Sequence, residues 1–575
     1  MNLFLLYQQK IFNFLKELRK KNLIDLPDNI KNLTIELPPK GEMGDISCNA
    51  ALILSKCNNK TPQDLALIIK DNLLNNFKEF EKIDIAKKGF LNIKFNIDFW
   101  RNYLFEIVKL GSKFGSNTQV RKKYNVEFVS ANPTGPLHVG HSRGAVLGDV
   151  LSNLLKFNGH LVTKEYYVND FGVQIENFVK SVYFRILELT LNKKFPDDVN
   201  LYPGDYILDI AKKIIEQKKI IDFSKFESIK IKLTEESLKF SMELIKSDLN
   251  LLGIEHDQFV YESDLIKKNL VSKTVEKLKD DKFIYVGKLK PPKGEVIANW
   301  KSRDQLLFKS TLFGDDNDRA LQKNDGSWTY FASDIAYHAY KVNRDFEVLI
   351  NILGADHSGY IKRITAATKA VSKNKTSLIC KVSQLVKLFK DGKPFKMSKR
   401  KGDYITLDDL INEVGKDAVR FMMLSRNSEV ELDFDFEKVT EKSKENPVYY
   451  VQYAYARINS IFRTINLKID EHIKVKDKDF LLNDHEIQIL KKISEWPKCV
   501  ELSVSKLEPH RIPFYLYELV TLFHSYWNLG NDNKKFRFIT KDGKFIASRI
   551  VLLQALAIVI QNGMSILGVN APSSM

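Results

Sequence analysis

Apolar residues change their spacing along this chain, and the changes predict a mixture of strands and helices. Residues 124–130 read as a buried strand, and apolar side chains between Val146 and Leu155 then recur at helical spacing. Gly159 stands where a helix would end, before a second strand over residues 160–168. This succession predicts a βαβ unit with two parallel strands.

The pattern over the whole chain predicts three parts, in keeping with a length that exceeds what one hydrophobic core supports. Residues 1–115 predict an α+β domain with an alternating strand over residues 89–95. Residues 116–440 predict a Rossmann-type α/β domain with a parallel sheet, interrupted at about residues 181–325 by a Lys/Glu-rich, mostly helical insertion. Residues 441–575 predict an all-α helix bundle.

Further elements are expected inside these parts. The parallel sheet resumes with a strand over residues 348–353, and residues 377–389 predict one more strand. A helix should begin near Thr406, because Thr406 and Asp409 form a capping pattern. The helices expected in the last part, all with amphipathic or apolar periodicity, cover residues 448–465, 484–499, 513–526 and 546–566.

Composition narrows the classes of protein. The chain has 575 residues, 44% of them hydrophobic, and a formal net charge of +17. This charge suits a polyanionic partner, although lysines spread along the chain also favour solubility. Four widely spaced cysteines without a CxxC pair indicate neither a zinc site nor a disulfide framework. No stretch reads as a membrane span or a signal peptide, so we expect a cytoplasmic protein without a membrane partner.

The string His138-Val139-Gly140-His141 lies where the helix of the βαβ unit should begin. A helix N-terminus offers backbone N–H groups and a partial positive charge, and both stabilise an anion. The two histidines can donate hydrogen bonds to phosphate oxygens, and Gly140 lets a purine or ribose approach the backbone. The string therefore indicates a nucleotide site, although a histidine at a helix start can also be merely structural.

A second string, Lys396-Met397-Ser398-Lys399, lies in a basic, glycine-bounded loop over residues 396–402. Charge runs are usually solvated surface. Lysines on such a loop are nevertheless suited to the charge that develops on a triphosphate when its α-phosphorus is attacked and pyrophosphate leaves. Together and in this order, the two strings predict ATP chemistry.

At this point the chain resembles the class I aminoacyl-tRNA synthetases, and within them the arginyl-tRNA synthetase family. Besides the two strings, the resemblance is carried by residues 127–128, 132–133, 167–174, 202–206, 313–316, 330–334, 354–357 and 452–454. It implies ligation of L-arginine to the 3′-terminal adenosine of tRNA(Arg), through an arginyl-adenylate formed from ATP with release of pyrophosphate and then AMP. Mg²⁺ is implied with the nucleotide, and no metal ligands are implied in the protein.

The resemblance also implies residue roles in the handling of ATP. The residues expected to be catalytic are His138, His141, Lys396 and Lys399. The residues expected to bind ATP are His138, Gly140, His141, Met397, Ser398 and Lys399. Many members of the family carry a lysine three residues before the first histidine and lack the second lysine of the loop. This chain has Gly135 and keeps Lys399, so we expect the loop to supply the cation.

A pocket for arginine needs carboxylates in planar, bidentate reach of a guanidinium, and Glu127 and Asp334 are the candidates. Glu127 alternates with two apolar neighbours on its strand, so it can face the ligand while they face the core. Tyr330 and Asp334 are four apart and would share a helix face. The resemblance implies that arginine is held by Glu127, Asn132, Tyr330 and Asp334, with Asn132 near its α-amino group, and that His357 is a further arginine-binding residue. For Tyr330 alone, a role as a core aromatic is the stronger expectation.

The last part resembles the family's anticodon-binding domain down to its terminal Met575, and the first part resembles the domain that meets the tRNA elbow. Residues 449–457 hold too many aromatic side chains for one buried stripe, so we expect some to be exposed and to stack on splayed bases. Tyr453 and Arg457 are the chosen candidates, against the alternative that they only pack. We expect the protein to act as a monomer.

Three other functions remain open from the sequence. A class I synthetase for lysine would need one deep carboxylate, against which the pair Glu127 and Asp334 argues. A small nucleotidyltransferase could share the first string, but it would not need a tRNA-sized basic chain or a tyrosine-rich bundle. A non-catalytic tRNA-binding relative would be expected to lose one of the two strings, and both are intact.

Overall fold

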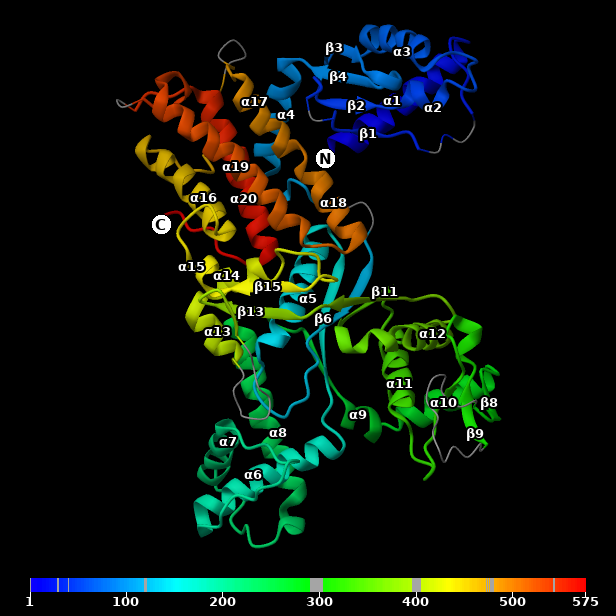
Figure 1. Ribbon diagram of the computed structural model, residues 1–575. Helices are drawn as coiled ribbons and strands as arrows, with labels where there is room; N and C mark the ends of the chain where they lie inside the picture. The colour runs from blue at the N-terminus through cyan, green and yellow to red at the C-terminus, as the bar shows by residue number, and fades with distance from the viewer. Residues whose placement is uncertain are drawn as a thin grey trace. The chain divides into compact units, whose positions relative to one another are not determined.

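The computed structural model describes the chain except for residues 1, 28–29, 31, 40, 118–120, 290–303, 396–404, 472, 474, 476–479 and 541–542 (Figure 1). The chain divides into two compact units. The first consists of Met1–Asn117, Lys442–Ile566 and Asn570–Met575, and the second of Thr118–Glu441 with Leu567–Val569. The parts expected at the two ends of the sequence thus belong to one unit, while the division into three domains at residues 115 and 440 stays a prediction.

Residues up to 117 form a four-stranded antiparallel sheet with the order β1-β2-β4-β3, together with four helices. Asn2 caps the first helix by accepting the N–H of Phe4 at 3.0 Å. The elements are α1 (Leu3–Lys20), β1 (Ile35–Glu36), β2 (Ile46–Cys48), α2 (Ala50–Leu54), α3 (Pro62–Asn76), β3 (Phe80–Ile85), β4 (Leu91–Phe95) and α4 (Ile97–Leu110). The α+β class expected for this part is confirmed.

The same unit contains the C-terminal helix bundle. Its helices are α16 (Pro447–Thr464), α17 (Asp484–Ser494), α18 (Trp496–Lys506), α19 (Arg511–Asp532) and α20 (Ala547–Leu567). The single helix expected over residues 484–499 is wrong, because Pro497 in the first turn of α18 lacks the N–H that would continue α17. Among the described residues, α20 is long and apolar enough to cross a membrane, but 83% of its most apolar window is buried. It is therefore a core helix of the bundle.

A close backbone approach ties the N-terminal part to the bundle. The carbonyl of Phe114 accepts hydrogen bonds from Trp496 Nε1 at 3.0 Å and from Asn562 Nδ2 at 3.2 Å. Gly115 has a φ of +96°, and a Cβ there would lie 2.4 Å from Trp496 Nε1. Only glycine combines this conformation with this approach, so the chain at the predicted domain boundary near residue 115 is buried against the bundle.

The second unit is built on a five-stranded, fully parallel sheet with the order β12-β11-β5-β6-β7. The order reverses between β5 and β11, and ligands of such sheets bind beyond the carboxyl ends of the strands at this reversal. Glu127 is the last residue of β5, and Gly354 is the last of β11. The strands are β5 (Lys123–Glu127), β6 (Leu161–Val168), β7 (Gln258–Tyr261), β11 (Val348–Gly354) and β12 (Ser377–Ser383).

The helix α5 (Val139–Phe157) connects β5 to β6 and confirms the predicted βαβ unit. It packs closely on the sheet at Gly148, where a Cβ would lie 2.2 Å from the Phe128 ring. Val126 and Phe128 are fully buried, whereas Glu127 points to the opposite face of the sheet. The alternation predicted for this strand is therefore confirmed.

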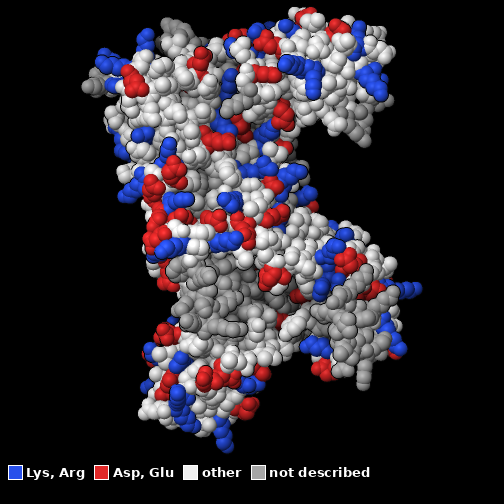
Figure 2. Space-filling model, viewed as in Figure 1, with Lys and Arg blue, Asp and Glu red and all other residues white. Residues whose placement is uncertain are grey.

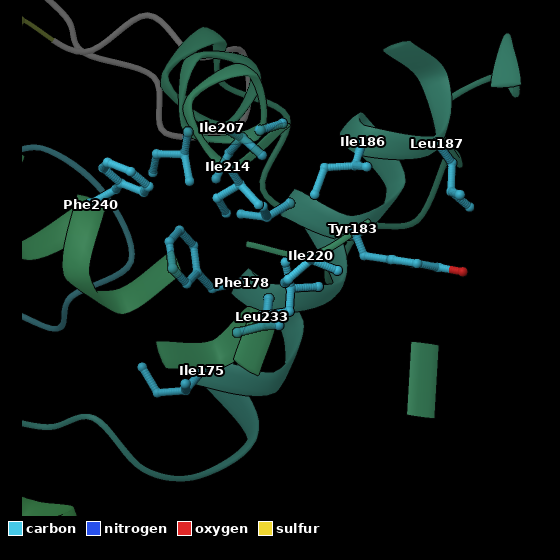
Figure 3. Close-up of a cluster of buried hydrophobic side chains, with 14 residues drawn as sticks. Ile175, Phe178, Tyr183, Ile186, Leu187, Ile207, Ile214, Ile220, Leu233 and Phe240 are labelled. Carbon is cyan, nitrogen blue, oxygen red and sulfur yellow. The ribbon is translucent and has the colours of Figure 1, made fainter. Parts of the chain in front are cut away.

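The segment expected to be a helical insertion also contributes to the sheet. β7 pairs with β6 and forms an edge strand of the parallel sheet. Its four residues are too few for a hydrophobic pattern to predict a strand. The helices α6 (Val173–Leu191), α7 (Asp205–Glu216) and α8 (Phe226–Leu251) enclose a hydrophobic cluster of their own, with Phe178, Ile207 and Leu233 among its buried members (Figure 3).

A small antiparallel sheet with the order β10-β9-β8 packs against α11 and α12 around a further cluster that includes Phe308, Phe331 and Ile364. The elements here are α9 (Glu262–Lys267), α10 (Leu270–Asp280), β8 (Ile284–Gly287), β9 (Gln305–Phe308), β10 (Arg319–Ala320), α11 (Tyr330–Val342) and α12 (Ile361–Ser372). Thr329 caps α11 by accepting the N–H of Ala332 at 3.3 Å.

The single strand expected over residues 377–389 is also wrong, because the chain changes sheets at Gln384. The Gln384 N–H donates to the Ser428 carbonyl at 2.9 Å, and its carbonyl accepts from the buried Arg143 at 3.1 Å. After this point the chain enters the sheet β14-β13-β15. The remaining elements are β13 (Val386–Lys390), β14 (Lys393–Phe395), α13 (Leu407–Val414), α14 (Lys416–Met422), β15 (Leu432–Asp435) and α15 (Phe436–Thr440).

Candidate functional site

The two histidines of the first string cap helix α5 reciprocally. His138 Nδ1 accepts the N–H of Gly140 at 3.1 Å, and His141 Nδ1 accepts the N–H of His138 at 3.2 Å. Their ring centroids are 4.0 Å apart. Because both Nδ1 atoms accept hydrogen bonds, the neutral rings carry their proton on Nε2, where it can be donated to a phosphate oxygen. The imidazoles are thus fixed in orientation at the positive end of a helix.

Backbone pairing joins this helix start to the end of the basic loop. The Val139 N–H donates to the Ile405 carbonyl at 3.2 Å, and the Leu407 N–H donates to the Leu137 carbonyl at 3.0 Å. Lys396, Met397, Ser398 and Lys399 themselves lie outside the described residues. The described residues on the C-terminal side of that segment nevertheless lie directly against the histidine string. Residues next to each of the two strings, which are more than two hundred residues apart in the sequence, therefore pair at the start of α5.

The helix α8 also supports this start. Asp248, which is 8% exposed, accepts the Leu137 N–H at 2.7 Å. Burial raises the pKa of Asp248 to about 6, although this hydrogen bond opposes the rise and the charge of Asp408 adds to it. A carboxylate from the inserted helices thus fixes the residue immediately before His138.

Glu127 and Asp334, the expected guanidinium ligands, come together at the carboxyl end of the sheet. The Glu127 carboxylate pairs with the buried ammonium of Lys341, and Ser130 Oγ donates to its Oε1 at 3.2 Å. Asp334 lies on α11, and Tyr360 donates a hydrogen bond to its Oδ2. Burial raises the pKa of Asp334 to about 7 against the effect of that hydrogen bond, and repulsion from Glu127 adds to the rise. The two carboxylates therefore share one acidic environment.

Backbone strain accompanies this site. Val129 and Ser130, which follow the strand of Glu127, have φ angles of +69° and +43°. The left-handed region is unfavourable for a β-branched residue such as Val129, and strain of this kind clusters at functional sites. The turn places the Ser130 hydroxyl between Glu127 and the Tyr167 N–H, from which it accepts at 3.1 Å.

The other expected arginine-binding residues are more exposed than Glu127 and Asp334. Asn132 Nδ2 donates to Gln174 Oε1 at 2.6 Å. Tyr330 begins α11 one turn before Asp334 and is 70% exposed, so the expectation of a core aromatic is wrong. His357 lies in the 3-10 helix η4 (Ala355–Tyr360) after β11, with its Nε2 3.6 Å from Asp356 Oδ2.

A second aromatic and basic cluster lies in the bundle of the first unit. The Arg457 guanidinium is 4.2 Å from the centroid of Tyr453 and 4.9 Å from that of Trp527. Tyr453 in turn stacks on Tyr449 with centroids 5.7 Å apart. Of the residues from 449 to 457 that were expected to be partly exposed, Tyr455 is buried, while Tyr453 and Arg457 keep part of their surface.

The C-terminal tail runs along the same helix. Gln452 Nε2 donates to the Asn570 carbonyl at 2.9 Å, and Arg463 Nη1 donates to the Ser573 carbonyl at 2.8 Å. Met575 is 57% exposed. On the face drawn in Figure 2, Lys and Arg side chains are interspersed with Asp and Glu rather than gathered in one patch. Net charge alone therefore does not mark an RNA surface there.

Sequence reasoning missed two residues that contact the carboxylates, Lys341 and Tyr360. The spacing of Asp334, His338 and Lys341 by four and three residues puts them on one face of α11, and this signal could have been found. Tyr360 offered no such signal, because it follows β11 in an irregular turn. Among the residues that the structure describes, no three His, Cys, Asp or Glu side chains are arranged to hold a metal ion.

Three comparisons bear on these observations. Residues 7–95 match the arginyl tRNA synthetase N terminal domain, residues 104–463 the catalytic domain of the class I (R) tRNA synthetases, and residues 451–575 the DALR anticodon binding domain. The chain is 56% identical over 577 residues to the arginine–tRNA ligase of Pelagibacter ubique (strain HTCC1062), with 100% of both chains covered. It is 46% identical over 546 residues to that of Ehrlichia ruminantium (strain Welgevonden), with 94% of each covered. Thermus thermophilus arginyl-tRNA synthetase has the same fold, with a TM-score of 0.72 at 18% identity over 100% of both chains.

Proposed function

The chain belongs to the arginyl-tRNA synthetase family and charges tRNA with arginine through an aminoacyl-adenylate, and from this premise we propose which residues carry the reaction. Its fold is that of a class I synthetase with a parallel-sheet catalytic domain, an N-terminal domain and a helical DALR domain. Enzymes of this class use ATP with Mg²⁺.

ATP is bound between the histidine string and the basic loop in this proposal. His138, Gly140 and His141 lie on one side of the nucleotide, and Lys396, Met397, Ser398 and Lys399 reach it from the other. The observation that supports the assignment is the pairing of Leu137 and Val139 with Leu407 and Ile405, because these bonds hold the residues that follow the basic loop in sequence beside the histidine string. Mg²⁺ bound with the nucleotide would neutralise phosphate charge, and no protein cage for the metal is part of the proposal.

Arginine is bound by Glu127 and Asp334 through its guanidinium, with Asn132 near its α-amino group and Tyr330 and His357 at the rim. Planar carboxylates that share one acidic environment are what bidentate recognition of a guanidinium requires. A lysine or citrulline side chain would leave part of these buried acceptors unpaired, and such a defect can give rejection on the order of 10⁴-fold. This proposal accounts for fidelity without an editing domain.

The first chemical step is in-line attack of the arginine carboxylate on the α-phosphorus of ATP, which forms arginyl-adenylate and releases pyrophosphate. The nucleophile is already ionised at neutral pH, so no general base is needed. The histidines and lysines hold the triphosphate in line and stabilise the negative charge that develops on it. Because the imidazoles are fixed by the helix cap, they need no reorganisation when that charge appears.

In the second step the 2′-hydroxyl of the terminal adenosine attacks the activated carbonyl, and AMP leaves. Tyr453, Arg457 and Met575 form the proposed anticodon contacts. Tyr453 and Arg457 lie together on α16 with a ring face and a cation suited to unstacked bases, and the C-terminal tail is bonded to the same helix at Asn570 and Ser573. The N-terminal domain is proposed to meet the tRNA elbow. A cytoplasmic monomer, and the need for bound tRNA before arginine is activated, complete the proposal.

Exchange of pyrophosphate into ATP tests this assignment, with each amino acid offered separately and with or without tRNA(Arg). We expect exchange with arginine and with no other amino acid, and only when tRNA(Arg) is present. Exchange should fall by at least about two orders of magnitude in the His141→Ala and Lys396→Ala variants. Exchange with lysine but not arginine would refute the pocket. Normal exchange in both variants would refute the nucleotide site.

A further inference from the structure

Behind the two carboxylates of the arginine pocket lies a buried polar chain of three residues. His338 and Lys341 come from α11, and Asn351 comes from β11. We propose that these three are positioning residues, which hold Glu127 and Asp334 at the spacing and charge that a guanidinium requires. The inference rests on the proposed assignment of those carboxylates to arginine.

The chain connects the two ligands through bonds of fixed direction. His338 Nδ1 lies 2.8 Å from the carbonyl of Asp334, which can only accept, so this nitrogen carries the proton. Burial, together with the charge of Lys341, lowers the pKa of His338 to about 3, so the ring is neutral and its Nε2 is an acceptor. Asn351 Nδ2 therefore donates to His338 Nε2 at 3.1 Å. The orientation of the Asn351 amide follows from the tautomer of His338.

With the amide fixed, its oxygen faces Lys341. Lys341 Nζ donates to Asn351 Oδ1 at 3.2 Å and also pairs with Glu127 Oε2. Asn351 is the register partner of Glu127 in the neighbouring strand, so the ammonium bridges β5 and β11 where the strand order reverses. An unbroken series of contacts thus runs from the backbone of Asp334 to the carboxylate of Glu127.

Lys341 is well held and far from water. The residue has 0% exposure, and its ammonium lies 4.4 Å from the centroid of the Tyr337 ring. Burying a cation is costly in free energy unless its partners are in place, so the Lys341 ammonium stays bound to Glu127 and Asn351. Because Oε2 of Glu127 already pairs with Lys341, the acceptors that remain for a ligand are Oε1 of Glu127 and the carboxylate of Asp334.

The charges of this arrangement also favour arginine. Glu127 and Asp334 with Lys341 sum to one negative charge when both carboxylates are ionised, which matches a single guanidinium. Without Lys341, two buried carboxylates would face each other, and repulsion would favour protonation of one of them. A planar guanidinium can span Asp334 and the remaining oxygen of Glu127, whereas the compact ammonium of a lysine substrate would meet only one of them.

A Lys341→Met variant of the full-length enzyme tests the proposal, because methionine replaces the aliphatic stem of lysine with one of similar length and removes the ammonium. We expect the KM for arginine in pyrophosphate exchange to rise at least about tenfold, with the KM for ATP nearly unchanged. The preference for arginine over lysine should fall by at least about tenfold. Lys341→Arg should recover part of both losses, because it keeps the charge.

Lys164→Met is the matched control. Lys164 lies on β6 of the same sheet and forms a largely buried pair with Asp149 of α5 at 2.5 Å, but it pairs with neither carboxylate of the proposed arginine site. This variant should lose thermal stability to a similar degree while keeping its KM for arginine. If Lys341→Met does not fold, Asn351→Ala interrupts the chain at its middle and should show the same rise in the arginine KM.

An arginine KM within about twofold of wild type in a folded Lys341→Met or Asn351→Ala variant would overturn the proposal, as would an equal rise in Lys164→Met. Glu127→Gln separates this failure from failure of the pocket itself. If Glu127→Gln raises the arginine KM and Lys341→Met does not, only the positioning role falls. If Glu127→Gln leaves it unchanged, the assignment of the pocket falls first.

Discussion

Tyr360 donates a hydrogen bond to Asp334 Oδ2, and this bond joins the end of η4, beyond β11, to one of the two carboxylates proposed to bind arginine. Burial raises the pKa of Asp334 to about 7, and the Tyr360 hydrogen bond acts against that rise. The carboxylate that should bind a guanidinium is thus close to half protonated at neutral pH when no ligand is present.

Arginine binding should therefore depend on pH below neutrality. A guanidinium favours the ionised form of Asp334, so binding at pH below about 7 must release a proton, and affinity should fall by up to about tenfold per pH unit. Above pH 8 the affinity should level off. Calorimetric titration with arginine from pH 5.5 to 8.5, in buffers of different ionisation enthalpy, measures both the affinity and the protons released.

Two variants identify the group responsible. Asp334→Asn should remove the pH dependence, and Tyr360→Phe should move its midpoint to higher pH, because the ionised form of Asp334 loses a donor. Burial also raises the pKa of Glu262 to about 7, with repulsion from Asp334 and Asp170, so Glu262→Gln is the necessary control. If Glu262→Gln alone flattened the profile, Asp334 would not be the titrating group.

Protein stability without ligand should depend on pH in the opposite direction to arginine affinity. Because the folded-state pKa of Asp334 lies above its usual value, its contribution to the free energy of unfolding is fully present below about pH 4 and is lost as the pH rises through about 7. Saturating arginine should offset this loss. Thermal unfolding with and without arginine at pH 6 and pH 8 should show a larger stabilisation by arginine at pH 8.

His138 should show separable structural and chemical roles. Asparagine is a good helix cap, so His138→Asn should keep the first turn of α5, whereas His138→Ala should cost about 1 kcal/mol. Both variants remove the imidazole N–H and should lower pyrophosphate exchange by about 10² to 10³-fold. Amide hydrogen exchange at the first turn of α5 measures the cap. If His138→Asn kept normal exchange of pyrophosphate, the histidine would be only a cap.

Lys399→Ala should lower arginine activation by orders of magnitude, because this chain has no lysine at position 135 to supply the cation. A second change, Gly135→Lys, would supply a lysine at that position, but a Cβ at Gly135 would lie 3.0 Å from the Tyr206 ring. The Tyr206 hydroxyl also donates to the Thr134 carbonyl at 2.8 Å. We therefore expect rescue by Gly135→Lys only when Tyr206 is also shortened, for example to serine.

The measurement is single-turnover formation of arginyl-adenylate by the three variants in parallel. Rescue by Gly135→Lys without a change at Tyr206 would show that the Tyr206 side chain moves aside despite its hydrogen bond to Thr134. Near-normal activity of Lys399→Ala itself would contradict the role given to the basic loop.

The sequence predicts a structural element reliably only where its hydrophobic pattern extends over many residues. The long apolar periods of α5, α16 and α20 were sufficient to predict these helices, and the alternation around Glu127 predicted which face it occupies. The four residues of β7 and the change of sheet at Gln384 were missed, because both are decided by pairing partners distant in sequence. Lys341 was missed for a related reason, since a buried lysine is recognised only once its partner Glu127 is known. Local sequence patterns thus predict helices, strands and motif residues. The residues that hold them in place are recognised only from contacts between distant parts of the chain.

Asp149 should be important for stability rather than for chemistry. It accepts from Lys164 and from Arg420, and all three side chains are largely buried. Both cations lower the pKa of Asp149, with Arg420 the stronger, although burial opposes them. Asp149→Asn would leave two buried cations uncompensated and should cost about 3 to 5 kcal/mol of unfolding free energy. Urea unfolding measures the loss, and an unchanged KM for arginine in the folded fraction is the accompanying expectation.

Tyr453 should contribute to tRNA binding by stacking, and the structure allows this to be separated from packing. Tyr453→Ala should raise the KM for tRNA by about 5 to 100-fold, the range expected for loss of one stacked base, while Tyr453→Phe keeps the ring and should change it little. The KM for arginine at saturating tRNA should stay the same in both. Tyr455→Phe is the control within the same helix, because it removes the buried hydroxyl that donates to Gln561 Oε1 at 3.3 Å without changing the exposed face. If Tyr455→Phe raised the tRNA KM as much as Tyr453→Ala, the effect would come from the packing of α16, and the anticodon contacts would have to lie elsewhere on the bundle.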